Sequence, residues 1–255
     1  MNRLLTLTLA AVAVAAFTAS SHAALILTQS TWIGDVDMTA QGTADWVVWD
    51  TGSIDKNKEW TAPISDARVE KAGGTAIGAL TKFDAVNPST QAIKDSNNDL
   101  AELSWTNGDA PTTGAATQGL RTGLETGVSG NDVVSSFGDG FTFDVTAGPA
   151  SQTLYVYTGT FNAGGTFRAI LKDDLGDEID SVIDSTALTG DKGIWEVTFS
   201  DASAETLTIE WENTTDSGNF DNVQIFGAAL IPEPASLALL GVGGLVMLRG
   251  RRRRA

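Results

Sequence analysis

The sequence predicts an all-β protein whose main domain is an antiparallel β-sandwich. Three observations lead to this prediction. Apolar and polar residues alternate with period two in a series of short segments, glycine, asparagine and aspartate separate these segments, and no segment between the two chain ends has apolar residues at helical spacing. Such alternation is typical of strands with one buried face. Strands that follow one another without intervening helices favour antiparallel pairing over a parallel sheet.

The first half of the chain has four weaker strand segments, at residues 24–27, 45–50, 64–69 and 100–105. In the second of these, Trp46 and Val48 point to one side of the strand, whereas Val47 and Trp49 point to the other. Both sides are apolar, which predicts either a strand buried on both faces or one that carries an exposed tryptophan. Loops and turns are expected at residues 50–62 and 72–98, and a long loop, or a weak strand near 122–128, within residues 107–132.

The second half of the chain has clearer strand segments, at residues 141–146, 152–158, 166–171, 194–199, 207–212 and 220–225. In the first of them, Phe141, Phe143 and Val145 alternate with polar residues. One domain over residues 24–227 is the simplest organisation, with residues 228–231 as a very short linker to the C-terminal segment. A domain of about two hundred residues is long enough to bury a substantial core.

The N-terminus has the organisation of a secretory signal peptide. Arg3 supplies the positive charge, residues 4–17 form an apolar segment, and Ser21 and Ala23 are small residues before the expected cleavage point. We therefore expect a signal helix within residues 1–23 and cleavage before Ala24. A first transmembrane helix is the alternative, and the short apolar segment disfavours it. Export implies an oxidising compartment, but the chain has no cysteine for a disulfide.

The last residues of the chain combine three features. Pro232, Glu233 and Pro234 come first, and the prolines exclude helix and favour an extended, accessible peptide. An uncharged apolar run follows at residues 235–248. The chain then ends in a basic cluster, which consists of Arg249, Arg251, Arg252, Arg253 and Arg254.

This order predicts a single C-terminal transmembrane helix whose arginines stop transfer on the cytoplasmic side of the membrane. The apolar run is shorter than the roughly 20 residues that span a bilayer. However, long arginine side chains reach the interface and extend the effective span. The alternatives are a terminal core helix with a solvated basic end and a basic arm for nucleic acid, which would not need the apolar run.

Residues 231–255 resemble the PEP-CTERM sorting signal, a tail that exosortases recognise on exported proteins of bacteria that make exopolysaccharide. The resemblance implies three parts: a signal peptide at 1–23, a β-sandwich ectodomain at 24–230 and a sorting signal at 231–255. It also implies an exosortase-type sorting protease and the inner membrane as partners. The expected location is the cell surface or the extracellular matrix, with the chain anchored in the membrane before processing.

Composition narrows the chemistry of the ectodomain. The only histidine, His22, lies in the signal peptide, so the mature chain has neither histidine nor cysteine. This excludes Ser-His-Asp triads, Cys-His pairs and histidine-bound zinc. Six of the 16 basic residues and one of the 32 acidic residues lie in the end signals, which leaves residues 24–230 with a formal charge of −21. Such an acidic surface disfavours nucleic acid as a partner.

We expect the ectodomain not to be an enzyme. A glycosidase that uses two carboxylates remains as an alternative. Glu196 and Glu210 lie on clear strand segments, opposite Trp195 and Trp211, and solvated strand faces explain them equally well.

Two groups of oxygen-bearing side chains are candidates for binding calcium, the one cofactor that the sequence suggests. The densest group consists of Asp173, Asp174, Asp177 and Asp180, with Gly176 to permit a sharp turn. Its spacing does not fit an EF-hand loop, and an acidic hairpin turn between two strands is the alternative. The second group consists of Asp216, Asn219 and Asp221.

Tryptophan side chains are candidates for stacking on a sugar ring. Trp105, Trp195 and Trp211 are in register with apolar neighbours, so we expect them in the core. Trp32 and Trp60 lie in segments expected to be loops, and one of Trp46 and Trp49 is a candidate for exposure. For each, simple packing is the alternative.

A second resemblance covers most of the ectodomain. Its order of segments is similar to that of galactose-binding-like jelly-roll modules, at residues 45–49, 103–108, 140–145, 152–157, 166–171 and 219–225. The resemblance implies a carbohydrate-binding type of β-sandwich and assigns no binding residue. Together, these features predict an exported surface or matrix protein with a structural or binding role linked to exopolysaccharide or biofilm. A carbohydrate-binding module for one glycan is the first alternative, and a carboxylate glycosidase the second.

Overall fold

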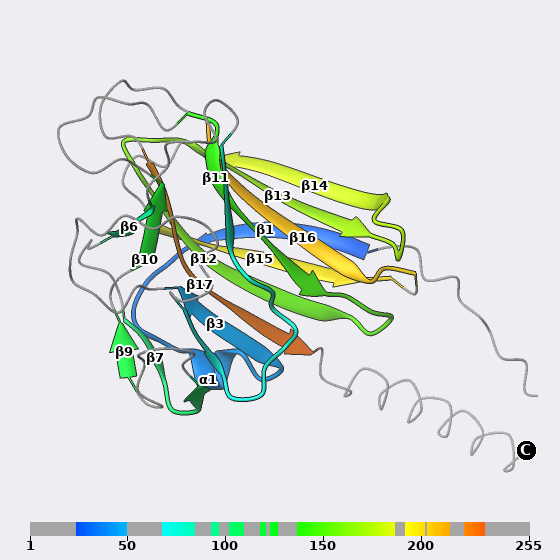
Figure 1. Cartoon of the computed structure of the whole chain (residues 1–255), viewed down its shortest axis with the longest axis horizontal. Helices are drawn as coiled ribbons and strands as arrows, with labels where there is room; N and C mark the ends of the chain where they lie inside the picture. Colours follow the sequence, from blue (N-terminus) through cyan, green and yellow to red (C-terminus); the bar gives the residue numbers. More distant parts are fainter. Residues whose placement is uncertain are drawn as a thin grey trace, which may run out of the picture.

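The computed structural model describes residues 24–49, 68–84, 93–96, 102–109, 118–120, 123–126, 137–186, 192–201, 203–214 and 222–232. Nearly all regular structure in these ranges is β-strand, arranged as two large sheets that pack face to face and one small sheet (Figure 1). The predicted all-β sandwich is therefore confirmed. The expected signal helix and C-terminal transmembrane helix lie outside the described residues. Within these ranges, no helix is both long and apolar enough to cross a membrane.

The larger sheet has nine strands. Seven follow one another in the order β1-β15-β12-β17-β3-β4-β8, while β10 pairs with β17 and β6 pairs with β10. Their bounds are β1 (Ala24–Thr31), β3 (Asp45–Trp49), β4 (Arg68–Lys71), β6 (Ile93–Ser96), β8 (Gly108–Asp109), β10 (Gly123–Thr126), β12 (Gln152–Phe161), β15 (Lys192–Ser200) and β17 (Asn222–Pro232). The last strand of the sequence thus lies in the middle of this sheet.

The second large sheet has five strands in the order β14-β13-β16-β11-β5. Their bounds are β5 (Thr81–Asp84), β11 (Asp139–Thr146), β13 (Gly165–Lys172), β14 (Glu178–Thr186) and β16 (Thr206–Asn213). The small sheet contains β2 (Val36–Asp37), β7 (Leu103–Trp105) and β9 (Gln118–Leu120), next to the one-turn helix α1 (Met38–Gln41). Among the described strand pairs, β2 with β7 is parallel and the others are antiparallel.

The main core lies between the two large sheets. Inward residues of the five-stranded sheet, such as Phe143, Phe167 and Trp211, meet Trp49 and Trp195 of the nine-stranded sheet. The rings of Phe167 and Trp195 are stacked, with centroids 4.8 Å apart and planes 16° from parallel. The predicted alternation of inward apolar and outward polar residues is therefore confirmed in these strands, because each has one face in this core.

A second core covers the opposite face of the nine-stranded sheet. It contains Trp46, Val48, Met38, Leu103 and Trp105, contributed by β3, α1 and β7. The helix α1 begins at Asp37, whose carboxylate accepts hydrogen bonds from the N–H groups of Thr39 and Ala40 at 2.9 and 3.3 Å. Since the small sheet and α1 lie over β3, this strand is buried on both faces. Of the two predicted alternatives for it, a strand buried on both faces and a strand with an exposed tryptophan, the first is therefore confirmed.

Several strand boundaries differ from those expected. The segment expected at 64–69 corresponds to β4 at 68–71, and the expected loops contain the short strands β5, β6, β8 and β9. β10 at 123–126 corresponds to the alternative of a weak strand near 122–128. β14 was not predicted. β17 runs to Pro232, so the segment 228–231, expected to be a linker, is the end of a central strand. This strand is buried along most of its length and has no alternation that would mark its end.

Candidate functional site

The junction between β17 and the C-terminal tail is the first part of the candidate site. β17 pairs with β12 on one side and with β3 on the other, and Leu230 lies in register with both Leu154 and Asp45. Leu230 is fully buried in the main core, and its carbonyl oxygen accepts a hydrogen bond from the N–H of Ala44 at 3.0 Å. Only Pro232, at the end of the strand, is exposed. Glu233, Pro234 and the five arginines of the tail lie outside the described residues.

The start of β1 and the end of β17 lie at the same end of the nine-stranded sheet. Ala24 is in register with Ser200, whereas Gln152 is in register with both Phe199 and Pro232. β15 and β12 therefore separate Ala24 from Pro232, a gap of about 14 Å at the usual spacing between strands. Figure 1 shows β1 beginning and β17 ending on this side of the sandwich. We call it the terminal end.

The tryptophans proposed to bind sugar are buried where the structure describes them. Trp46 and Trp49 have no exposed surface, and Trp32 is 7% exposed. Trp32 packs against Tyr157 and Phe226 in the second core, while its indole N–H donates to the carbonyl oxygen of Gly34 at 3.0 Å. A ring must be accessible to stack on a sugar. The expectation that these three tryptophans are exposed is therefore wrong, and the alternative, simple packing in the protein interior, applies. Trp60 lies outside the described residues.

The acidic segment proposed as a calcium site forms the turn between β13 and β14. The carboxylate of Asp173 accepts hydrogen bonds from the N–H groups of Leu175 and Asp177 at 3.0 and 2.8 Å. Gly176 has a φ of 83°, which the turn requires at this position. The side chain of Asp180 is on β14 and accepts from the N–H of Ser181.

This geometry corresponds to the hairpin-turn alternative. The carboxylate of Asp173 is already engaged with the backbone of its own turn. Asp173, Asp174, Asp177 and Asp180 do not come together as a metal cage, and the described residues contain no group of three or more acidic side chains that could hold a metal ion. The second proposed group, Asp216, Asn219 and Asp221, lies outside the described residues.

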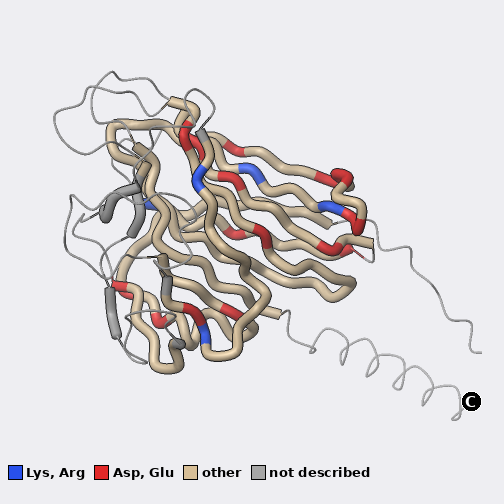
Figure 2. The backbone as a smooth tube through the Cα atoms, viewed as in Figure 1, with Lys and Arg blue, Asp and Glu red and all other residues tan. Residues whose placement is uncertain are grey.

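A shallow hollow of about 560 Å³ lies at the terminal end, between the turns that follow β11, β13 and β15. Its lining consists of Thr146, Ala147, Gly148, Pro149, Asp174, Ser203, Ala204 and Glu205. The hydroxyl and N–H groups of Ser203 next to Asp201 lower the pKa of that carboxyl. Figure 2 shows acidic residues concentrated at the turn between β13 and β14. None of the described residues that line the hollow is aromatic, so these residues offer no stacking surface for a sugar.

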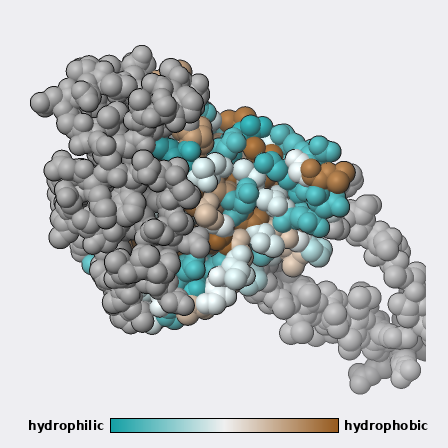
Figure 3. All heavy atoms as spheres, in the orientation of Figure 1, coloured by the Kyte–Doolittle hydropathy of each residue, from teal (hydrophilic) through white to brown (hydrophobic). Residues whose placement is uncertain are grey.

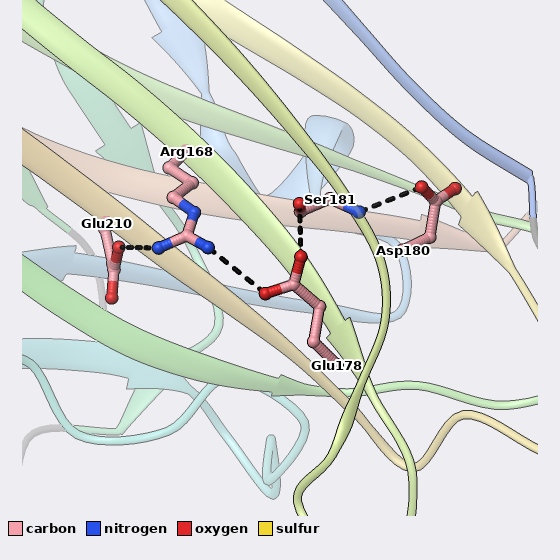
Figure 4. A network of polar contacts seen from close by, with 5 residues as sticks. All are labelled: Arg168, Glu178, Asp180, Ser181 and Glu210. Atoms are coloured by element: carbon pink, nitrogen blue, oxygen red, sulfur yellow. Dashed lines mark hydrogen bonds and ion pairs between the residues drawn. The ribbon is translucent and has the colours of Figure 1, made fainter.

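The outer face of the five-stranded sheet carries a polar network (Figure 4). The guanidinium of Arg168 on β13 lies 3.1 Å from Glu178 of β14 and 3.5 Å from Glu210 of β16. The hydroxyl of Ser181 donates to the other oxygen of Glu178. Partial burial and the negative charge of Glu210 raise the pKa of the Glu212 carboxyl. Because the ion pairs are partly exposed, they join neighbouring strands but contribute at most about 1 kcal/mol each.

Glu196 and Glu210, the carboxylates named as a glycosidase alternative, are on different sheets. Trp195 and Trp211, their neighbours in sequence, both point into the main core. Glu196 therefore points away from the core on β15, and Glu210 points away from it on β16, on the opposite side of the sandwich. Two carboxylates that flank a glycosidic bond are roughly 5–10 Å apart on one side of a cleft. This pair cannot act on a single bond.

Two structural residues next to the junction were not found from the sequence. The carboxylate of Asp45 is buried and accepts hydrogen bonds from the N–H groups of Trp46, Ala76 and Ile77 at 2.8, 2.7 and 2.9 Å. The ammonium group of Lys71 donates to the carbonyl oxygens of Gly42, Thr43 and Ala44. Lys71 thus holds the segment that precedes β3, and Asp45 ties the start of β3 to the segment after β4. An aspartate at the start of an apolar strand is the only sequence signal for either.

The comparisons with known proteins agree with the sequence at the tail. Residues 230–254 match the model of the PEP-CTERM protein-sorting motif. This motif indicates an exported protein that is sorted to the cell surface or the extracellular space. No curated protein matches the chain.

Three solved structures have partly similar folds. The enzymatically active domain of bacteriophage CBA120 tailspike protein 4 is 13% identical, with a TM-score of 0.37, and the match covers 60% of this chain and 19% of that one. The CBM22-1 and GH10 modules of Clostridium thermocellum endo-1,4-beta-D-xylanase 10B, complexed with xylohexaose, are 9% identical, with a TM-score of 0.36 and coverages of 61% and 26%. A xylan-binding domain from Paenibacillus barcinonensis is 11% identical, with a TM-score of 0.35 and coverages of 61% and 87%. The chain thus spans about a quarter or less of the first two. TM-scores this low support no conclusion about ligand or activity.

Proposed function

We propose that this chain is an exported protein processed by an exosortase-type protease, and that its acidic β-sandwich has a structural or binding role at the cell surface or in the extracellular polysaccharide. The match of residues 230–254 to the sorting motif carries this proposal. The signal-peptide pattern at residues 1–23 gives the chain a route across the membrane. The apolar run and the arginines would hold the tail in the inner membrane until processing.

The composition of the mature chain supports a role other than catalysis. Without histidine or cysteine, acid–base and nucleophilic chemistry would fall to carboxylates, tyrosines, lysines and hydroxyls. Burial raises the pKa of Tyr155, with a further contribution from Glu196, and raises that of Tyr157 well above its usual range. Neither phenol is therefore poised to lose its proton near neutral pH.

Deleting residues 233–255 tests the anchor without shortening β17. We expect the full chain to be found in the inner membrane before processing, and the deleted chain to be folded and soluble in the medium. A Pro232→Ala/Pro234→Ala variant is the matched control, because it keeps the apolar run and the arginines but changes the motif. It should stay in the membrane unprocessed. A deleted chain that remains cell-associated to the same extent as the full chain would exclude the tail as the anchor.

Carbohydrate binding by the sandwich is the second candidate. Phe161, at the end of β12, is 40% exposed, and Phe137, just before β11, is 48% exposed. Both positions are at the end of the sandwich opposite the terminal end, where an accessible ring suits stacking on a sugar. Titration with soluble polysaccharides should then show saturable binding that Phe161→Ala weakens and Leu175→Ala, an exposed apolar control, does not. Equal binding by both variants would exclude this surface.

A further inference from the structure

The sorting motif and the fold share residues 230–232. The match to the motif begins at residue 230, whereas β17 ends at Pro232. No spacer therefore separates the sandwich from the Pro-Glu-Pro sequence. Proteases cleave preferentially in exposed segments such as loop tips and chain ends. Here the residues before Pro232 are paired already.

The end of β17 is enclosed by two neighbouring strands and by both cores. Ala228, Ala229 and Leu230 lie between β12 and β3, and none of them has exposed surface. The side chain of Leu230 is in the main core, and that of Ala229 is in the second core. Ile231 and Pro232 pair with β12 alone. Exposing a bond in residues 228–230 would separate the central strands of the larger sheet, which requires global unfolding rather than local fraying.

The tail has little length between the sandwich and the membrane. Four residues, 233–236, separate Pro232 from Leu237, the first leucine of the apolar run at 235–248. Fully extended, these four residues span about 14 Å. A chain held in the membrane by its apolar run therefore keeps the terminal end of the sandwich within about this distance of the apolar region.

We infer that the folded sandwich itself limits where the tail is processed, because it shields every bond before Pro232. This inference rests on the proposed function, because it takes processing of the tail as given. Processing is a hydrolysis: water adds across the peptide bond that is cleaved, leaving a carboxylate on the sandwich and an amine on the released tail. The mature protein would then keep β17 complete.

The experiment is intact-mass measurement of the folded, processed protein from cells that express the full chain. For the wild type we expect a C-terminus at residue 232 or later. Leu230→Ala removes buried contacts at the end of β17 and should add products that end before residue 230. Leu171→Ala is the matched control, since it makes the same deletion in the same core but on β13. It should give the wild-type C-terminus.

A second measurement keeps the test valid if both variants fold poorly. Brief digestion of the detergent-solubilised wild-type full chain with proteinase K should leave a protected fragment that ends at residue 232 or later. A wild-type product or protected fragment ending before residue 232, or identical products from the two leucine variants, would overturn the inference. A full chain that loses no C-terminal residues in cells while its proteinase K fragment still reaches residue 232 would instead refute the proposed sorting function.

Discussion

Replacing Asp45 by alanine should strongly destabilise the fold, because this carboxylate ties the start of β3 to the segment after β4. Asp45 is the first residue of β3, it is 3% exposed, and it lies in register with Leu230 of β17. Its two carboxylate oxygens accept three backbone N–H groups, two of which belong to Ala76 and Ile77 in the segment after β4. The variant leaves these donors without an acceptor.

The magnitude follows from the burial of the donors. Trp46 has no exposed surface and Ile77 is 6% exposed, so their N–H groups would lose their acceptor inside the protein. A buried donor without a partner costs about 1–3 kcal/mol, and two cost about 2–6 kcal/mol. Ala76 is partly exposed, so its N–H can bind water instead. The loss is a large part of the roughly 5–15 kcal/mol that stabilises a typical domain.

Urea unfolding followed by tryptophan fluorescence measures this loss as a difference in the free energy of unfolding. Asp144→Ala is the control, because Asp144 is exposed and accepts one hydroxyl hydrogen bond, from Thr208 at 2.7 Å. It should cost about 1–3 kcal/mol, less than Asp45→Ala, because one donor rather than two loses its acceptor in the protein. Asp45→Asn should fall between the two, since the amide keeps one acceptor oxygen. A loss for Asp45→Ala no greater than that of the control would refute the proposed role of this carboxylate.

Three further changes have distinct expected outcomes. Phe167→Ala, which removes a buried ring stacked on Trp195, should cost about 3–5 kcal/mol in urea unfolding. Asp173→Ala should lower the free energy of unfolding by about 1–2 kcal/mol, because the turn loses two hydrogen bonds. This loss should be the same with and without calcium in the buffer. A loss that depends on calcium would favour a metal site. The raised pKa of Glu212 means that the folded state holds this proton more tightly, so stability is lost as pH rises from 4.5 through the raised pKa. Glu212→Gln should remove that part of the loss between those pH values in unfolding titrations, and an unchanged pH profile would contradict the assignment.

The strands that were predicted well are those with one face in the main core. In β11, β13, β15 and β16 the alternation is regular because the opposite face carries polar side chains such as Thr142 and Glu210. β14 was missed because acidic residues at 178, 180 and 184 dominate its sequence and suggested a turn. Its exposed Ile179 and Ile183 also break the pattern, and Figure 3 shows apolar atoms among hydrophilic ones on this part of the surface.

The candidate site was harder to predict than the fold, since its form depends on what covers the nine-stranded sheet. The sequence shows that both sides of β3 are apolar, but not that α1 and β7 lie over Trp46. A tryptophan on such a strand is equally compatible with a second core and with an open sugar site. The end of β17 was mispredicted for a similar reason. Its residues 225–231 are uniformly apolar or small, and they resemble the apolar run in the tail that follows.

The central position of β17 connects the fold to the tail. An edge strand at the C-terminus could fray and lengthen the tail at little cost, since it is paired on one side only. β17 is paired on both sides, and its inward residues, including Val223, Ile225 and Leu230, belong to the main core. The sandwich therefore lacks its centre until residue 230 is available for pairing. Only six residues then remain before Leu237. The residue that completes the sheet and the apolar run that enters the membrane are therefore separated by this short stretch of chain.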